Sequence, residues 1–230
     1  MKSRSRRDQV VTGAALAAVL AWDLSGLDLP LSRLFADASG FAWRDAWFTR
    51  VLLHDGGRWA AAAVLLGVAL GALWPRQGGP SRAERWWAAG TVLLGLAVVP
   101  ALKRGSRSSC AWDLTEFGGQ ANYVPHWQFG VFDGGPGHCF PSGHAVAAFA
   151  FLALYFLWRP HRPRRARLWL AGTLAAGVVF GAAQVLRGAH LASHVLWSAW
   201  ICWALAAAAD ALLNRRLALA AGLLPGGSRA

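Results

Sequence analysis

The sequence has few charged residues, and few acidic ones in particular. Only 15% of its 230 residues are charged, and Asp and Glu together number 11 against 23 Lys and Arg. With 56% hydrophobic residues and a mean hydropathy of +0.35, this scarcity excludes a disordered chain and argues against an ordinary soluble domain. In a soluble protein a net charge of +12 would indicate a nucleic-acid partner. Here the basic residues fall between apolar segments, so we expect no nucleic-acid partner and interpret them as determinants of membrane orientation.

Tyr and Met are also scarce, with two copies and one, whereas the chain has 14 Trp and 26 Gly. Trp collects at membrane interfaces, and Gly is commoner in membrane helices than in soluble ones. The composition therefore predicts a single integral membrane domain over residues 1–230. Because a bilayer core needs about 20 helical residues, the fold class that we expect is all-α, a six-span transmembrane helical bundle. Its apolar stretches lie near 10–27, 59–75, 86–102, 143–158, 168–186 and 195–213.

The first apolar stretch is the weakest, because Asp23 interrupts it. The basic residues KSRSRR before it are also typical of a signal peptide, for which Ala36-Asp37-Ala38 resembles a cleavage site. That tripeptide lies too far beyond the apolar run, so we interpret 10–27 as a retained span.

Lys and Arg gather in alternate connections. Fifteen of the 23 fall in the N-terminal tail, the second and fourth connections and the C-terminal tail. By the positive-inside tendency we expect both termini to be cytoplasmic in a multi-pass protein of the bacterial inner membrane. The segments 28–58, 103–142 and 187–194 then face the periplasm. The fifteen residues are Lys2, Arg4, Arg6, Arg7, Arg76, Arg82, Arg85, Arg159, Arg162, Arg164, Arg165, Arg167, Arg215, Arg216 and Arg229.

The sharpest motif is Pro141-Ser142-Gly143-His144, directly before an apolar run. Ser142 is a favourable N-cap, and the free N–H groups at a helix start bind phosphate oxygens. Gly143 allows the backbone to approach a ligand closely, and His144 can exchange a proton with it. The alternative is a proline-initiated helix with a structural, interfacial His.

A second group of polar residues precedes the last apolar stretch. If residues 187–194 extend that helix, then Arg187, His190 and His194 share one face. A guanidinium that can hold phosphate would then stand one turn from an imidazole that can attack it. Lys103, beside Arg104 and Arg107, begins the 103–142 loop; the alternative for this group is a cluster of snorkelling side chains.

These three motifs, in this order, resemble the type 2 phosphatidic acid phosphatase (PAP2) superfamily over about 60–213. The family pattern is roughly KxxxxxxRP, PSGH and SRxxxxxHxxxD. The resemblance implies a PAP2/haloperoxidase-like core and a metal-independent phosphatase, without a cofactor, that works through a phosphohistidine. It makes His190 the nucleophile and His144 the general acid and base. The phosphate-binding groups that it implies are Lys103, Arg107, Ser142, Gly143 and Arg187.

The chain departs from the family pattern at three places. Cys110-Ala111 stands where the family has Arg-Pro, and Gln184 stands where it has the Arg before the nucleophile. We interpret Arg107 and Arg187 as the substitutes. His194 replaces the family's orienting Asp; it can accept a hydrogen bond from His190, but it stabilises an imidazolium less than a carboxylate does. We expect Asp113 or Glu116 of the loop to supply the missing charge, and an inactive relative remains an alternative.

A site at the external face of the inner membrane implies an amphiphilic substrate, that is, a lipid phosphate. Undecaprenyl phosphate or pyrophosphate, phosphatidylglycerol phosphate, phosphatidic acid and the phosphorylated glucosamine of lipid A all fit. A lipid phosphotransferase using the same phosphohistidine is the nearest alternative. A membrane metal or haem protein is a further one, although the chain has no HExxH or paired CxxC motif, so we expect no metal ligands.

The three cysteines divide into two kinds. Cys202 falls within the last apolar stretch and is interpreted as a small buried residue. Cys110 and Cys139 share the external loop, in a compartment where disulfides persist. The sequence therefore predicts a Cys110–Cys139 disulfide, and two unpaired thiols are the alternative.

Overall fold

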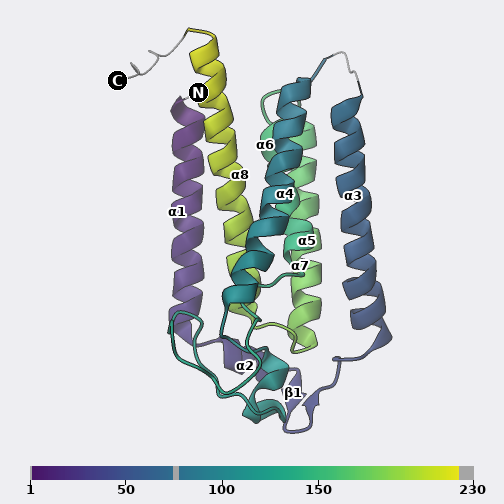
Figure 1. The fold of residues 1–230 in the computed structure, drawn as a ribbon, viewed down its shortest axis with the longest axis vertical. Helices are drawn as coiled ribbons and strands as arrows, with labels where there is room; N and C mark the ends of the chain where they lie inside the picture. Colours follow the sequence, from purple (N-terminus) through teal and green to yellow (C-terminus); the bar gives the residue numbers. More distant parts are fainter. Residues whose placement is uncertain (1, 75–77, 223–230) are drawn as a thin grey trace.

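The computed structural model describes residues 2–74 and 78–222, which form a helical bundle with one short β-hairpin (Figure 1). The prediction of a helical protein is confirmed, with this hairpin as the departure from all-α. The hairpin pairs β1 (Ala36–Asp37) with β2 (Gly40–Phe41). The helices are α1 (Lys2–Ser25), α2 (Asp28–Arg33), α3 (Gly56–Leu73), α4 (Arg82–Gly105), α5 (Val146–Phe149), α6 (Ala153–Trp158), α7 (Pro163–Leu186) and α8 (Ala192–Ala220). A π-helix covers Phe48–Asp55, and 3₁₀ turns cover Ala111–Asp113, Thr115–Phe117 and Ala150–Leu152.

Four helical segments are long and apolar enough to cross a membrane: Phe48–Leu73, Arg82–Gly105, Pro163–Leu186 and Ala192–Ala220. A fifth apolar segment, Val146–Trp158, is shorter. By the same measure of length and composition α1 does not qualify, although it lies beside α8 (Figure 1). The four segments indicate a membrane protein, and the count of six spans stays a prediction.

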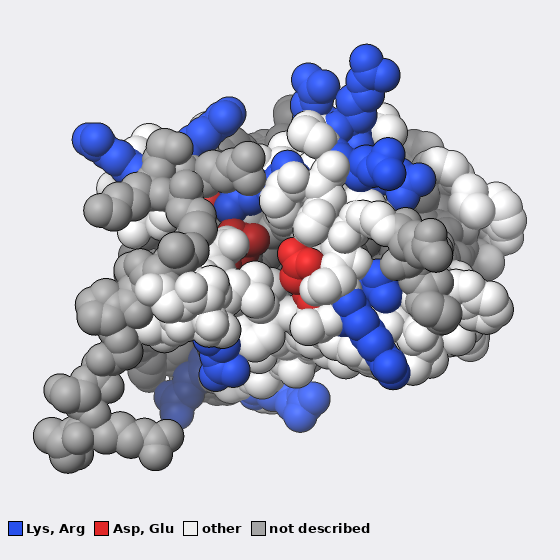
Figure 2. All heavy atoms as spheres, turned by 90° about the horizontal axis from the view of Figure 1, so that it is seen from above, with Lys and Arg blue, Asp and Glu red and all other residues white. Residues whose placement is uncertain are grey.

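The bundle has two distinct ends. The start of α1, the end of α8 and the α3–α4 and α6–α7 connections lie at one end, which we call the terminal end (Figure 1). The opposite end, which we call the site end, holds α2, the hairpin and the 103–142 loop (Figure 1). Viewed from the terminal end, Lys and Arg side chains lie around the rim of the face, with acidic side chains nearer its centre (Figure 2). The basic connections thus share one end, although Arg76 and Arg229 lie outside the described residues.

Local sequence determines where the long helices begin. α4 starts with a capping box in which Ser81 Oγ accepts a hydrogen bond from the Glu84 N–H (3.2 Å) and Glu84 accepts one from the Ser81 N–H (2.7 Å). α7 starts at Pro163, where a missing N–H costs no helical hydrogen bond. The apolar residues that follow each start then extend the helix across the bundle.

A largely buried ion-pair cluster joins three segments at the terminal end. Arg159, directly after α6, donates two hydrogen bonds of 2.7 Å to Asp8 of α1 and one of 2.7 Å to Asp210 of α8. A guanidinium bound to a carboxylate through two hydrogen bonds fixes orientation as well as distance. The cluster therefore sets the height of α1 against the rest of the bundle.

The apolar core lies where α4, α5, α6 and α8 meet. It includes Val92, Leu152 and Cys202, all of them buried. α7 approaches this core at Gly177, where a Cβ would overlap the ring of Phe149. Close packing at such points makes the helices a rigid support for the segments at the site end.

The site end has a smaller apolar core of its own. Phe41 of the hairpin and Leu114 and Phe117 of the 103–142 loop are buried together with Leu191, which precedes α8. Cys110 and Cys139 form a disulfide, so that prediction is confirmed, and Cys202 is a free, buried thiol. The loop that leaves α4 is therefore fastened both to the hairpin and to the chain that leads into α5.

We predict that topology reporters will place the two ends on opposite sides of the membrane. Fusions after Arg82 and after Arg164 should be cytoplasmic, and a fusion within residues 118–135 should be external, because the basic connections share the terminal end. A fusion preceding α1 should also be cytoplasmic if α1 is a span. An external signal after Arg164 would contradict the arrangement.

We also predict that the disulfide stabilises the fold. It closes a loop with a sequence separation of 29 residues, for which the chain-entropy model gives about 3–4 kcal/mol. The double variant Cys110→Ser/Cys139→Ser should unfold at lower urea concentration in detergent, whereas Cys202→Ala should keep the disulfide and serves as the control. Equal unfolding midpoints, or alkylatable thiols at both positions in untreated protein, would rule the stabilisation out.

Candidate active site

The Pro-Ser-Gly-His turn is joined to the start of α8 by two hydrogen bonds to the backbone of Ser142. The N–H of Ser142 donates to the carbonyl of His194 (3.0 Å), and Ser198 Oγ donates to the carbonyl of Ser142 (2.9 Å). Regular helix begins only at Val146, but Ser142 Oγ accepts a hydrogen bond from the Ala145 N–H (3.4 Å), as a capping side chain does. Ser142 is thus fully buried and fixed relative to α8.

The chain between α7 and α8 turns sharply and does not extend α8. Gly188 adopts φ +71°, and a Cβ there would overlap the ring of Phe41. The expectation that Arg187, His190 and His194 share one helical face is therefore wrong, because a left-handed residue interrupts the helix. The turn nevertheless carries His190 back into the protein, where it packs beside His194.

His190 and His194 lie together against the disulfide. His190 is 3% exposed, its ring centroid is 5.8 Å from that of His194, and its Nδ1 is 3.6 Å from Cys139 Sγ. Burial, together with the neighbouring His194 and the positive charge of Lys103, holds the pKa of His190 well below its ordinary value of 6.5. The ring is therefore neutral at neutral pH, and the neutral ring is the form that can act as a nucleophile.

The ammonium of Lys103 lies beside the Pro-Ser-Gly-His turn. A Cβ on Gly143 would be 3.4 Å from Lys103 Cδ and 3.9 Å from its Nζ, so the glycine leaves the lysine a close approach to the backbone. Lys103 and His144 both act electrostatically on His190. The end of α4, the turn before α5 and the α7–α8 connection therefore converge at the site end.

His144 is held by the π-helix before α3, a segment without a recognisable motif in the sequence. Its Nε2 lies 3.2 Å from the carbonyl oxygen of Leu53, and its ring stacks on His54 with centroids 4.4 Å apart. Burial, together with the positive charges of His54 and Arg187, lowers the pKa of His144 to about 4. The π-helix that carries His54 thus forms one wall of the site.

The three basic or amide side chains that we aligned with the family's arginines are placed differently. Arg187 is buried, and its Nε donates to the carbonyl of Arg44 (2.9 Å). Arg107 is exposed, and its guanidinium donates to the carbonyl of Gly130 (3.2 Å). Gln184 is buried, and its Nε2 has no hydrogen-bond partner among the described residues. Of the two arginines, Arg187 acts electrostatically on His144, whereas Arg107 is bound to the 103–142 loop.

The two acidic residues expected to assist His194 are engaged elsewhere. Asp113 accepts a hydrogen bond from the Cys110 N–H (3.2 Å), and Glu116 forms an exposed ion pair with Arg33. A buried carboxylate that does face one of the site-end histidines is Asp23 of α1, whose Oδ2 lies 3.4 Å from His126 Nε2. Asp23 could have been noticed in the sequence, because it interrupts an apolar stretch.

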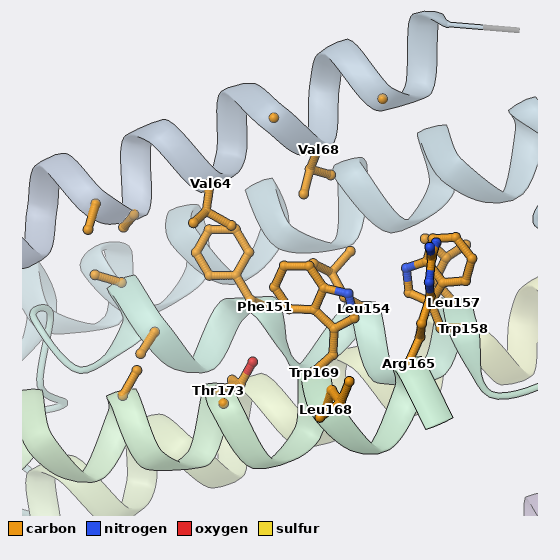
Figure 3. A pocket seen from close by; sticks show the side chains of 18 of the residues that line it. Val64, Val68, Phe151, Leu154, Leu157, Trp158, Arg165, Leu168, Trp169 and Thr173 are labelled. Atoms are coloured by element: carbon orange, nitrogen blue, oxygen red, sulfur yellow. The ribbon is translucent and has the colours of Figure 1, made fainter. Parts of the chain in front are cut away.

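An apolar groove begins beside the site and runs toward the terminal end between α3, α6 and α7 (Figure 3). Its volume is about 790 Å³, and its lining is mostly aliphatic and aromatic, with Val64, Val68, Phe151 and Trp169 among the side chains that face it. At the site end it reaches Phe180, whose ring centroid is 5.7 Å from that of His144. Hydrocarbon can therefore lie in the bundle directly next to the polar residues.

Comparison with known proteins gives one match. Residues 84–217, more than half of the chain, match the model of the PAP2 superfamily. No curated protein and no solved structure matches the chain. The matched range contains Lys103, the Pro-Ser-Gly-His turn and His190, and it leaves α1 outside. With these motifs brought together at one end of a helical membrane bundle, the chain belongs to the PAP2 superfamily.

Proposed function

We propose that this protein hydrolyses a phosphate monoester or pyrophosphate of an amphiphilic lipid through a phosphohistidine at His190. One observation carries the proposal, namely the convergence of Lys103, the Ser142–His144 turn and a neutral His190 at one end of an apolar bundle. Membership in the PAP2 superfamily supports a phosphatase or phosphotransferase in general. We place the site at the periplasmic face of the bacterial inner membrane, because basic residues gather at the opposite end.

In the first step a ring nitrogen of His190 attacks phosphorus, and the bond from phosphorus to the leaving oxygen breaks. Lys103, Arg187 and the N–H groups at the start of the turn stabilise the negative charge on the equatorial oxygens. His144 donates a proton to the leaving oxygen, so that the lipid alcohol or phosphate departs without a localised charge.

In the second step His144, now neutral, accepts a proton from water as the water oxygen attacks phosphorus. The bond between phosphorus and His190 breaks, phosphate leaves, and His190 regains its neutral ring. Two chemically capable groups on opposite sides of the phosphoryl group are sufficient for both steps.

The groove supports a lipid as the substrate. Its lining residues on α7 run from Arg165 to Phe180, a rise of about 22 Å at about 1.5 Å per residue. That length exceeds half of the roughly 30 Å hydrocarbon core. A polyprenyl chain that crosses the midplane fills such a groove better than an acyl chain confined to one leaflet. Among the candidate substrates we therefore favour undecaprenyl phosphate or pyrophosphate.

The chemistry of the sulfur argues against the metal-protein alternative. Cys139, His190 and His194 have ligand atoms within 4.8 Å of one another. However, Cys139 is bonded to Cys110 and has no thiolate to offer. Two imidazoles remain, fewer than the three or four protein ligands that zinc sites use.

We predict that the purified protein in detergent will release phosphate from a lipid phosphate panel and that His190→Ala will abolish the release. The panel contains undecaprenyl pyrophosphate, farnesyl pyrophosphate and dioleoyl phosphatidic acid, and we expect the longest polyprenyl chain to give the highest kcat/KM. Loss of the nucleophile should cost on the order of 10⁴-fold or more in kcat, because nucleophile and acid act as a unit.

A control separates the two histidines. His144→Ala should still form an acid-labile phosphoenzyme from p-nitrophenyl phosphate, whose leaving group needs no proton, whereas His190→Ala should form none. Phosphoenzyme in His190→Ala that disappears in His194→Ala would show that the nucleophile is His194. Transfer of the phosphoryl group to a second lipid, with no release of phosphate, would identify a phosphotransferase.

We predict that kcat/KM is highest below pH 6.5. His144 must be protonated to act as an acid, and its pKa of about 4 lies below the ordinary value, so the reactive form is lost as the pH rises through that range. His54→Gln removes a neighbouring positive charge, which raises the pKa of His144, so the alkaline limb of the pH profile should move to higher pH. His161→Gln, which alters a His bound to Glu84 at the terminal end, is the matched control and should leave the limb in place. An alkaline limb that stays in place or moves to lower pH in His54→Gln would contradict the assignment.

A further inference from the structure

The proposed reaction leaves one electrostatic requirement unmet. When the bond between His190 and phosphorus forms, the ring gains positive charge, and a neutral His194 stabilises that charge less than a carboxylate does. Asp113 and Glu116 are engaged elsewhere. A buried negative charge that reaches His194 by another route would meet the requirement.

A file of buried side chains leads from His190 to α1. The ring of His194 is 6.1 Å from that of His126, with an interplanar angle of 85°. His126, from the 103–142 loop, stacks on Phe140 with centroids 4.0 Å apart, and its side chain is 6% exposed. Its Nε2 lies 3.4 Å from Oδ2 of Asp23. The file thus contains three imidazoles and ends on a carboxylate.

Asp23 has capacity left for this role. Its side chain is 4% exposed; Oδ2 accepts a hydrogen bond from Trp197 Nε1 (2.9 Å), and Oδ1 has no hydrogen-bond partner among the described residues. The neighbouring carboxylate, Asp28, is by contrast taken up in fixing the start of α8, because it accepts hydrogen bonds from the N–H and Oγ of Ser193. A buried carboxylate with an unfilled oxygen is costly, which points to a function beyond packing.

The carboxylate also gives the file a direction. Burial lowers the pKa of His126 to about 4, so at neutral pH its ring is neutral and carries one N–H. Nε2 of His126 lies 3.4 Å from Asp23 and has no hydrogen-bond partner among the described residues, so the tautomer with its N–H on Nε2 points a donor toward the carboxylate and leaves the other nitrogen as an acceptor. His194 has ring contacts with both His126 and His190, and its Nδ1 has no hydrogen-bond partner among the described residues. One ring nitrogen of His190 and one of His194 lie within 4.8 Å of each other. One bridging water or a small side-chain rotation can connect two groups at this separation by hydrogen bonds.

We propose that Asp23, acting through His126 and His194, is the positioning residue that orients His190 and supplies the negative charge which the family pattern places at position 194. The inference rests on the proposed function. It assigns a part of the active site to α1, which lies outside the matched residues 84–217. His194 and Asp23 then replace the family's Asp together, because a His at position 194 can serve in its place only if a carboxylate lies behind it.

The test is a double-mutant cycle between positions 23 and 194, measured as phosphate release from farnesyl pyrophosphate by the full-length protein in detergent. Asp23→Asn should lower kcat about 10-fold or more with KM changed less than about 2-fold, since it acts on the transition state. Asp23→Glu should restore part of the loss. In the His194→Asp background, where the charge is beside His190 again, Asp23→Asn should cost less than about 2-fold.

Asp133→Asn is the matched control, because Asp133 is a buried carboxylate with a structural role, in which it accepts hydrogen bonds from the N–H groups of Ser109 and Gly135. It should lower the unfolding midpoint, and its effect should be the same with His or Asp at position 194. An equal loss from Asp23→Asn in both backgrounds would overturn the proposal while leaving the phosphatase itself established by the wild-type activity.

A second measurement does not depend on activity. In protein labelled with ¹⁵N-histidine, Asp23→Asn should shift the imidazole resonances of His126, His194 and His190, because the tautomers lose their common acceptor. The resonance of His161 at the terminal end should not move. Unchanged His194 and His190 resonances would overturn the proposal even if none of the substrates is hydrolysed, an outcome that would separately reject the proposed function.

Discussion

The candidate site depends on two hydrogen bonds to the backbone of Ser142, which join it to α8. Its N–H and its carbonyl are both used, the first by His194 and the second by Ser198. Two motifs about fifty residues apart in sequence are thereby held in one register. The disulfide and Lys103 then act on a geometry that is already fixed, the first by closing the loop behind His190 and the second by approaching Gly143.

Burial determines the charge state of this geometry. His190 and His144 lie where water is largely excluded, so both are neutral without a ligand, and the positive charge near them comes from Lys103 and Arg187. An incoming phosphate brings negative charge into this low-dielectric region and favours protonation of His144. In the mechanism that we propose, substrate binding thus favours the protonated acid that the first step requires. The order of phosphate binding and His144 protonation therefore follows from the electrostatics of the site.

Much of the bundle could be predicted from the sequence, because apolar stretches, a Pro at a helix start and the distribution of Lys and Arg are local signals. The disulfide could also be predicted, since two cysteines share a loop and the third lies within an apolar stretch. The break at Gly188 was missed because the spacing of Arg187, His190 and His194 fits a helix, and only contact with Phe41 shows why a glycine is required there. His54 was missed because stacking on His144 is a long-range contact without a pattern in the sequence.

The position of Asp23 follows from a contact at the far end of the molecule. Arg159 fixes Asp8 of α1 at the terminal end, and Asp23 lies fifteen residues farther along the same helix, a rise of about 22 Å. A continuous helix changes its length little, so the ion-pair cluster determines the height at which Asp23 meets His126. The indole of Trp197 then fixes the carboxylate laterally. A helix outside the family's matched range is in this way held at both ends by residues within it, and this makes an additional helix precise enough to contribute to an active site.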